Sequence, residues 1–114
     1  MIKSLKNEKW KTVKLDSGDF RFKYAVSDKG RLASFKTNLL EGTLLRGTLM
    51  GGYPTLKLKP AGENLTLFLH RLVAEAFIAN RSSKKVYVIH LNYNKEDNSV
   101  KNLRWATKEE MEAH

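Results

Sequence analysis

The stretch "KKVYVIHLNYNKEDNSVKNLRWATKEE", from Lys84 to Glu110, decides the fold of the C-terminal part of the chain. Its short run of β-branched and aromatic residues, 86–89, predicts a strand that leads directly into His90. A loop rich in asparagine follows, and "LRWA" then predicts the partner strand. Two short strands joined by such a loop form a hairpin-like unit that holds the histidine at its edge.

A helix start follows the second predicted strand. Thr107 is a good helix cap, because its hydroxyl can accept a hydrogen bond from an early backbone N–H. Glu109 and Glu110 fall in the first turn, where the helix dipole favours carboxylates. Residues 84–114 are therefore predicted to form a strand–loop–strand–helix finger.

Upstream of the finger, the pattern changes to alternation. Between residues 20 and 26, apolar side chains occupy every second position, with Arg21, Lys23 and Ala25 between them. This period of two predicts a half-buried strand with a basic outer face. Glycines punctuate a turn at Gly30 and further short strands up to Phe68, so residues 20–68 are predicted to form a basic antiparallel β-meander.

A helix is predicted to connect the meander to the finger. Its apolar positions recur with the helical spacing of three and four residues and are Leu69, Leu72, Val73, Ala76 and Phe77. The predicted helix spans residues 69–80. The fold class is thus α+β: an N-terminal antiparallel meander, a connecting amphipathic helix and a C-terminal finger, all in a single domain of residues 1–114.

The composition indicates a polyanionic partner. The chain has 114 residues, 41% hydrophobic and 29% charged, with a net charge of +9 and a pI near 9.9. Residues 1–57 carry 12 Lys+Arg against 5 Asp+Glu, a net of +7, whereas residues 58–114 carry a net of +2. Such a balance favours DNA, RNA or an anionic membrane surface and places most phosphate contacts in the first half.

The same composition limits the class of protein. There is no cysteine, so disulfides and thiolate zinc sites are excluded. The N-terminal segment has no apolar run typical of a signal peptide, and no segment approaches the ~20 apolar residues of a membrane span. We therefore expect a cytoplasmic protein.

Four segments, taken together, carry a resemblance to a known family. They are "YAVSDKGRLASF" (24–35), "GGYPTLKL" (51–58), "LHRLVAEAFI" (69–78) and "VIHLNYNKEDNSVKNLRWAT" (88–107). In this order they resemble the HNH homing-type endonucleases of phages and bacteria that carry an N-terminal nuclease-associated β-motif. The resemblance covers roughly residues 8 to 114 and implies that the finger is a ββα-metal finger and that the partner is double-stranded DNA.

The resemblance also implies roles for individual residues. His90 matches the general base that activates water, and Asn102 matches the asparagine that steadies the loop around that imidazole. Asn94 and Asn98 match amides that shape the loop, and Trp105 matches an aromatic residue that closes the small core beneath the finger. The implied catalytic residues are therefore His90 and Asn102.

Two positions depart from the family pattern, and both concern the metal. The family places a ligand immediately before the base, where this chain has Ile89, and another on the final helix, where it has Met111. Neither an aliphatic side chain nor a soft thioether suits magnesium. Glu110 and His114 are the candidate substitutes, so a divalent metal, magnesium or manganese, is expected only if the protein is catalytically active.

The basic residues of the meander and helix are the predicted DNA contacts. They are Arg21, Lys23, Arg31, Lys36, Arg46, Lys57, Lys59 and Arg71. Alternation with apolar residues would place several of them on one surface, as a β-ribbon laid against a duplex requires. A solvated charged face is the alternative interpretation, and Arg71 in particular either faces solvent or reaches a phosphate.

Three functional hypotheses follow. The first is a DNA-binding protein of the HNH endonuclease family with a degenerate metal site and weak or no cleavage. The second is an active metal-dependent nicking endonuclease with His90 as its base, and the third is a protein-interaction module. His70 is predicted to bond a loop carbonyl or to cap its helix, while Tyr53 and Tyr93 are left as either core or stacking residues.

Overall fold

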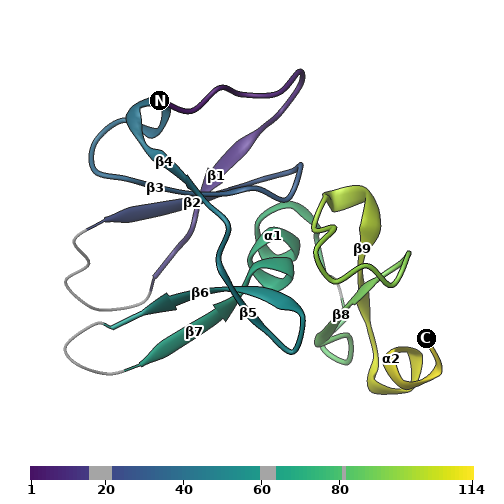
Figure 1. Ribbon diagram of the computed structural model, residues 1–114. Coiled ribbons are helices and arrows are strands. Elements are labelled where there is room, and N and C mark those ends of the chain that lie inside the picture. The colour runs from purple at the N-terminus through teal and green to yellow at the C-terminus, as the bar shows by residue number, and fades with distance from the viewer. Residues whose placement is uncertain (16–21, 60–63, 81) are drawn as a thin grey trace.

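The computed structural model describes residues 1–15, 22–59, 64–80 and 82–114, and it confirms the predicted α+β class. Figure 1 shows the antiparallel strands of the N-terminal part on the left, helix α1 (Leu69–Phe77) near the centre and the finger on the right. The helix therefore lies between the two parts that the sequence distinguishes.

The first four strands form one antiparallel sheet in sequential order. They are β1 (Trp10–Thr12), β2 (Lys23–Ser27), β3 (Leu32–Phe35) and β4 (Thr43–Leu45), with the short 3-10 helix η1 (Leu39–Glu41) before β4. The sequence did not predict β1, because its residues are mostly polar. It forms by pairing with β2, in a register that places Trp10 opposite Ser27.

The next three strands form a second antiparallel sheet. They are β5 (Thr48–Met50), β6 (Tyr53–Leu58) and β7 (Leu65–Phe68). The predicted meander is therefore divided between two sheets, and the chain passes from one to the other around Gly47. This glycine has a φ of +79°, and a Cβ there would lie 2.6 Å from the carbonyl oxygen of Thr55, so only glycine suits the crossing.

The predicted alternation of β2 is only partly correct. Lys23 is exposed as predicted, but Ala25 is buried although its position in the alternation predicted an outward direction. Val26 belongs to the core that contains α1, and Ala25, which points to the opposite face, is only 1% exposed, so both faces of β2 are covered. Phe20 and Arg21 lie outside the described residues.

Helix α1 supplies the centre of the core. It ends at Phe77, three residues before the predicted end, and its stripe of Leu69, Leu72 and Val73 is buried. These side chains join apolar residues of both sheets and of the finger, namely Val26, Leu32, Leu56 and Leu103. A single core thus connects the two sheets with the finger. Within the described part of the chain, no helix has the length and apolar character that crossing a bilayer requires.

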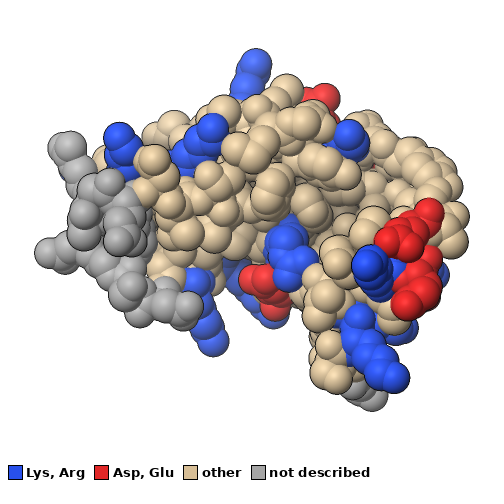
Figure 2. Space-filling view, turned by 90° about the horizontal axis from the view of Figure 1, so that it is seen from below, with Lys and Arg blue, Asp and Glu red and all other residues tan. Residues whose placement is uncertain are grey.

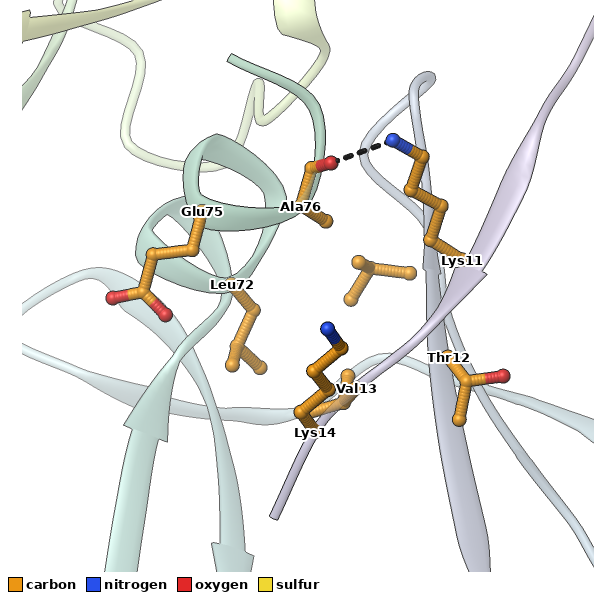
Figure 3. A pocket seen from close by; sticks show the side chains of 8 residues that line it. Lys11, Thr12, Val13, Lys14, Leu72, Glu75 and Ala76 are labelled. Carbon is orange, nitrogen blue, oxygen red and sulfur yellow. Dashed lines mark hydrogen bonds between the residues drawn. The ribbon is translucent and has the colours of Figure 1, made fainter. Parts of the chain in front are cut away.

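A lysine of β1 caps the C-terminal end of helix α1. Figure 3 shows Lys11 reaching across a cavity of about 330 Å³, where its Nζ donates to the carbonyl oxygen of Ala76 at 2.9 Å. The same Nζ lies 5.0 Å from the ring centroid of Phe77. Carbonyls of the last helical turn lack partners within the helix, so a cation here satisfies one of them and also favours the helix dipole.

The finger has the predicted order of elements. It consists of β8 (Tyr87–His90), the 3-10 turn η3 (Val100–Asn102), β9 (Leu103–Ala106) and α2 (Lys108–Ala113). Strands β8 and β9 pair antiparallel, with Ile89 opposite Arg104. The predicted cap is confirmed as a full capping box: Thr107 Oγ1 accepts from Glu110 N at 3.1 Å, and Glu110 Oε1 accepts from Thr107 N at 3.0 Å.

Candidate active site

His90 stands at the end of β8, with its ring held by a buried asparagine. Its Nε2 lies 2.7 Å from Oδ1 of Asn98, a side chain of which only 2% is exposed. Because an amide oxygen accepts hydrogen bonds and cannot donate them, Nε2 carries the proton in this arrangement. Nδ1 is then the nitrogen with the free lone pair, which is the form that a general base requires.

Asn102 holds the loop that follows His90. Its Oδ1 accepts from Asn92 N at 2.9 Å, while its Nδ2 donates to Asn92 Oδ1 at 2.9 Å and to the carbonyl of Asp97 at 2.8 Å. Its backbone carbonyl also accepts from Leu91 N at 2.8 Å. One buried amide therefore ties both ends of the loop together and fixes the chain on either side of it.

The N-terminal motif supports the same loop from outside the finger. The carbonyl of Asp28 accepts from Val100 N at 2.9 Å. Gly30, with a φ of +82°, lies so close that a Cβ would be 2.5 Å from the carbonyl carbon of Asn98. The residue that orients His90 is thus packed directly against the turn between β2 and β3, and any side chain at position 30 would displace it.

An aromatic cluster lies against His90 and includes His70, which was not predicted to contact it. His70 lies with its ring centroid 5.0 Å from that of His90 and 5.1 Å from that of Tyr53. The prediction that His70 bonds a carbonyl or caps the helix is wrong: its Nδ1 is buried and has no hydrogen-bond partner among the described residues, and Phe68 is the cap residue. No local pattern links positions 70 and 90, which are brought together only by packing.

This environment makes His70 sensitive to pH. Burial lowers the pKa of His70 to about 4, assisted by repulsion from His90 and Arg71. The unfolded chain binds a proton near pH 6.5, so folding stability is complete above that pH. It falls as the pH drops towards about 4, by up to ~1.4 kcal/mol per pH unit.

We therefore expect urea unfolding between pH 7.5 and pH 4.5 to show a steeper loss of stability for the natural protein than for His70→Gln, since glutamine does not titrate. Parallel curves for the two proteins would contradict a neutral, buried His70.

The two positions where the family resemblance implies metal ligands carry side chains that do not suit a hard divalent cation. Ile89 is 5% exposed and aliphatic, and Met111 offers only a thioether. Of the candidate substitutes, Glu110 uses its carboxylate in the capping box and in a pair with Arg104 at 3.8 Å. The backbone hydrogen bond from Thr107 lowers the pKa of this carboxyl, as expected for a group already stabilised as an anion. In the part of the chain that the structure describes, no three His, Cys, Asp or Glu side chains are arranged to hold a metal.

His114, the other substitute, contacts the site through the backbone of His90. Its Nε2 donates to the His90 carbonyl at 2.7 Å, and its ring stacks on Tyr93 at 4.3 Å between centroids with 13° between the planes. That nitrogen is occupied and cannot also bind a metal. Tyr93 is thus a stacking residue, whereas Tyr53 is half-buried and belongs to the cluster of His70 and His90.

Two of the predicted DNA contacts are engaged within the protein. Arg31 Nε donates to Glu8 Oε2 at 2.8 Å, and this pair joins the N-terminal segment to the sheet. Burial alone would raise the pKa of Glu8, but hydrogen bonds from Arg31 and neighbouring groups lower it to about 2. Arg71 Nη1 donates to the carbonyl of Val86 at 2.6 Å and its guanidinium lies over the Trp105 ring at 5.6 Å, so it ties α1 to the finger.

The other described candidates are exposed. They are Lys23, Lys36, Arg46, Lys57 and Lys59. The register of β2 and β3 places Lys23 opposite Phe35, the residue before Lys36, and Lys57 and Lys59 flank Leu58, the last residue of β6. The start of β2 and the end of β6 lie at the left of Figure 1, away from the finger. In Figure 2, blue side chains are scattered over the whole face shown, from left to right, and the largest red group lies at the right, on the side of the finger.

Comparison with known proteins agrees with this geometry. Residues 8–59 match the NUMOD4 motif, and residues 67–113 match the HNH endonuclease family. The chain is 33% identical over 113 residues to the uncharacterised HNH endonuclease L247 of Acanthamoeba polyphaga mimivirus, and this match covers 97% of the chain. It is 35% identical over 98 residues to the DNA endonuclease I-HmuI of Bacillus phage SP01, a match that covers 86% of the chain.

A solved structure supports the same relationship. A structure that describes DNA binding and cleavage by the HNH homing endonuclease I-HmuI aligns with a TM-score of 0.65 and 30% identity, over 89% of this chain and 53% of that one. The chain spans only part of these relatives, 27% of L247 and 52% of I-HmuI by sequence.

Proposed function

Because the chain belongs to the HNH endonuclease family, we propose that it binds double-stranded DNA through its N-terminal cations and cleaves it weakly or not at all. The observation that carries the second half of this proposal is the chemistry at two positions. Ile89 and Met111 stand where the family resemblance implies metal ligands, while His90 and its supporting loop are retained.

The energetics favour binding over cleavage. A general base typically contributes only about 10²–10⁴-fold to a rate. Enzymes that catalyse slow reactions require much larger accelerations, many orders of magnitude beyond this. With an intact base and no suitable ligands for a cation, the charge on the departing oxygen has no partner, and His90 alone leaves phosphodiester cleavage slow.

The proposed DNA surface consists of the five predicted contacts that are exposed: Lys23, Lys36, Arg46, Lys57 and Lys59. Each phosphate that they neutralise releases a condensed counterion, so the affinity must fall steeply with salt. Five contacts predict a slope of log K against log salt of about −4.5, which corresponds to roughly 500-fold weaker binding between about 50 and 200 mM salt.

We expect the double variant Lys57→Ala/Lys59→Ala to reduce this slope by about 2, since two phosphate contacts are removed. Fluorescence anisotropy with a duplex of about 30 base pairs, longer than the 41 Å molecule at ~3.4 Å per pair, measures it. Lys84→Ala, an exposed lysine outside the N-terminal part, serves as the matched control and should leave the slope nearly unchanged. Absence of a complex at low salt would reject the DNA-binding proposal and favour a protein-interaction module.

Active nicking is the second candidate function, and the observation in its favour is the intact support of His90 by Asn98 and Asn102. It requires magnesium or manganese held with other donors. A plasmid-nicking assay with both ions distinguishes the two proposals: cleavage by the natural protein that His90→Ala abolishes would establish this second function in place of a degenerate site.

A further inference from the structure

Tyr93 adopts a backbone conformation that its side chain disfavours. Its φ is +65°, in the left-handed region, where residues other than glycine, asparagine and aspartate are uncommon. The residue nevertheless remains 67% exposed, so burial does little to offset the strain. Strain of this kind persists where the surroundings impose it, and it is concentrated at functional sites.

Hydrogen bonds on both sides of Tyr93 impose this left-handed backbone conformation. The Asn92 side chain accepts from Asn94 N at 2.9 Å and is itself held by Asn102, so the loop is fixed on both sides of Tyr93. The Tyr93 backbone N–H donates to the carbonyl oxygen of His90 at 3.1 Å. The tyrosine ring is therefore presented to solvent in a fixed position, next to the candidate active site.

The ring is also half of a stacked pair. The imidazole of His114 lies parallel to it, and His114 Nε2 donates to the same His90 carbonyl that Tyr93 N contacts. Both rings are thus anchored to one backbone atom of His90. Because one face of Tyr93 is covered by His114 while most of its surface is exposed, the pair offers a flat aromatic surface with one side open.

We propose that this Tyr93–His114 stack receives an unpaired DNA base, so that the protein prefers DNA containing a gap or bulge to continuous duplex. The inference rests on the proposed DNA-binding function and specifies its substrate. The net charge of +9 attracts the phosphate backbone of DNA. The bases attached to that backbone are flat and uncharged, and they stack on aromatic side chains. Bases within a duplex are already stacked on both faces, so only a base that has left the duplex stack can pack against Tyr93.

The test compares two duplexes of equal length, one continuous and one with a single unpaired 2-aminopurine at its centre. Anisotropy should give about 10-fold tighter binding of the second, in the range expected for one base stacked on an aromatic ring. The 2-aminopurine fluorescence should be quenched on binding, because the base stacks on Tyr93. Tyr93→Phe should retain both effects, since it keeps the ring.

Tyr93→Gly is the decisive variant. Glycine adopts the left-handed conformation without strain, so the thermal midpoint should stay equal or rise, while the affinity ratio falls to about 1 and quenching is lost. Leu91→Ala removes a neighbouring exposed apolar side chain that has no ring, and should preserve the ratio. Two results would contradict stacking of a base on Tyr93 and leave the DNA-binding proposal intact. They are equal binding of both duplexes by the natural protein, and an affinity ratio that Tyr93→Gly does not alter. Failure to bind either duplex would instead reject the DNA-binding proposal.

Discussion

Replacing Ile89 with Asp and Met111 with Asn together is expected to give the protein magnesium-dependent nicking activity at least ~10³-fold above that of the natural chain. The two substitutions provide a carboxylate and an amide at the positions where the family resemblance implies ligands. Oxygen donors of this kind suit hard cations. A bound cation that stabilises charge in the transition state contributes several kcal/mol, and each ~1.4 kcal/mol is tenfold in rate.

The gain in nicking activity should depend on His90, the retained general base. Adding His90→Ala to the double variant should abolish the new activity, since Nδ1 of His90 is the nitrogen left free to accept a proton. Supercoiled plasmid, converted to open circle with magnesium and unchanged with EDTA, provides the readout. If the natural chain already nicks at the rate of the double variant, the metal site is not degenerate and the proposed function is wrong.

Binding of the metal can be measured without activity. Ile89 is 5% exposed, so an aspartate there buries a carboxylate and should destabilise the metal-free variant by about 2 kcal/mol or more. Magnesium or manganese should raise its thermal midpoint and leave that of the natural protein unchanged. A midpoint of the double variant that neither ion affects would show that these two positions do not complete a metal site.

The finger was predictable because its signals are local. The short β-branched strand, the asparagine-rich loop and the Thr107 cap each act over a few residues, and the structure contains β8, β9 and α2 where these signals occur. The connecting helix follows from the spacing of Leu69, Leu72 and Val73, which are buried. In each case the sequence pattern and the tertiary environment favour the same structure.

Features that depend on distant residues were not predictable in the same way. Strand β1 forms only by pairing with β2, and the division into two sheets depends on the close approach of Gly47 to Thr55. The contact between His70 and His90 likewise arises from packing of α1 against the finger. None of these partners is adjacent in sequence, so no local period reveals them.

The net charge includes cations that are engaged inside the fold. Arg31 and Arg71 contribute to the net charge that indicates a polyanionic partner, but one pairs with Glu8 and the other bonds Val86 and lies over Trp105. A sum of charges does not distinguish a cation held inside the fold from one that faces solvent. The exposed lysines of β2 and β6 are therefore better candidates for phosphate contacts than the arginines with internal partners.

The second large effect is expected at Asn102. Asn102→Ala should lower the free energy of unfolding by about 3 kcal/mol, because it removes three side-chain hydrogen bonds and leaves the N–H of Asn92 and the carbonyl of Asp97 without their partner. For a domain of this size, the loss corresponds to a decrease of about 10 °C in thermal midpoint.

Substitution by aspartate separates the two halves of this interaction. Asn102→Asp retains an acceptor for Asn92 N but loses both donated bonds and places a buried carboxylate against the carbonyl of Asp97, so at pH 7 its midpoint should lie at or below that of Asn102→Ala. Asn94→Ala is the matched control, since Asn94 is exposed and its Oδ1 accepts only from Glu96 N at 3.1 Å. It should cost less than about 1 kcal/mol. Equal losses for Asn94→Ala and Asn102→Ala would mean that the loop is not held by the buried amide, and the fixed orientation of His90 would then need another cause.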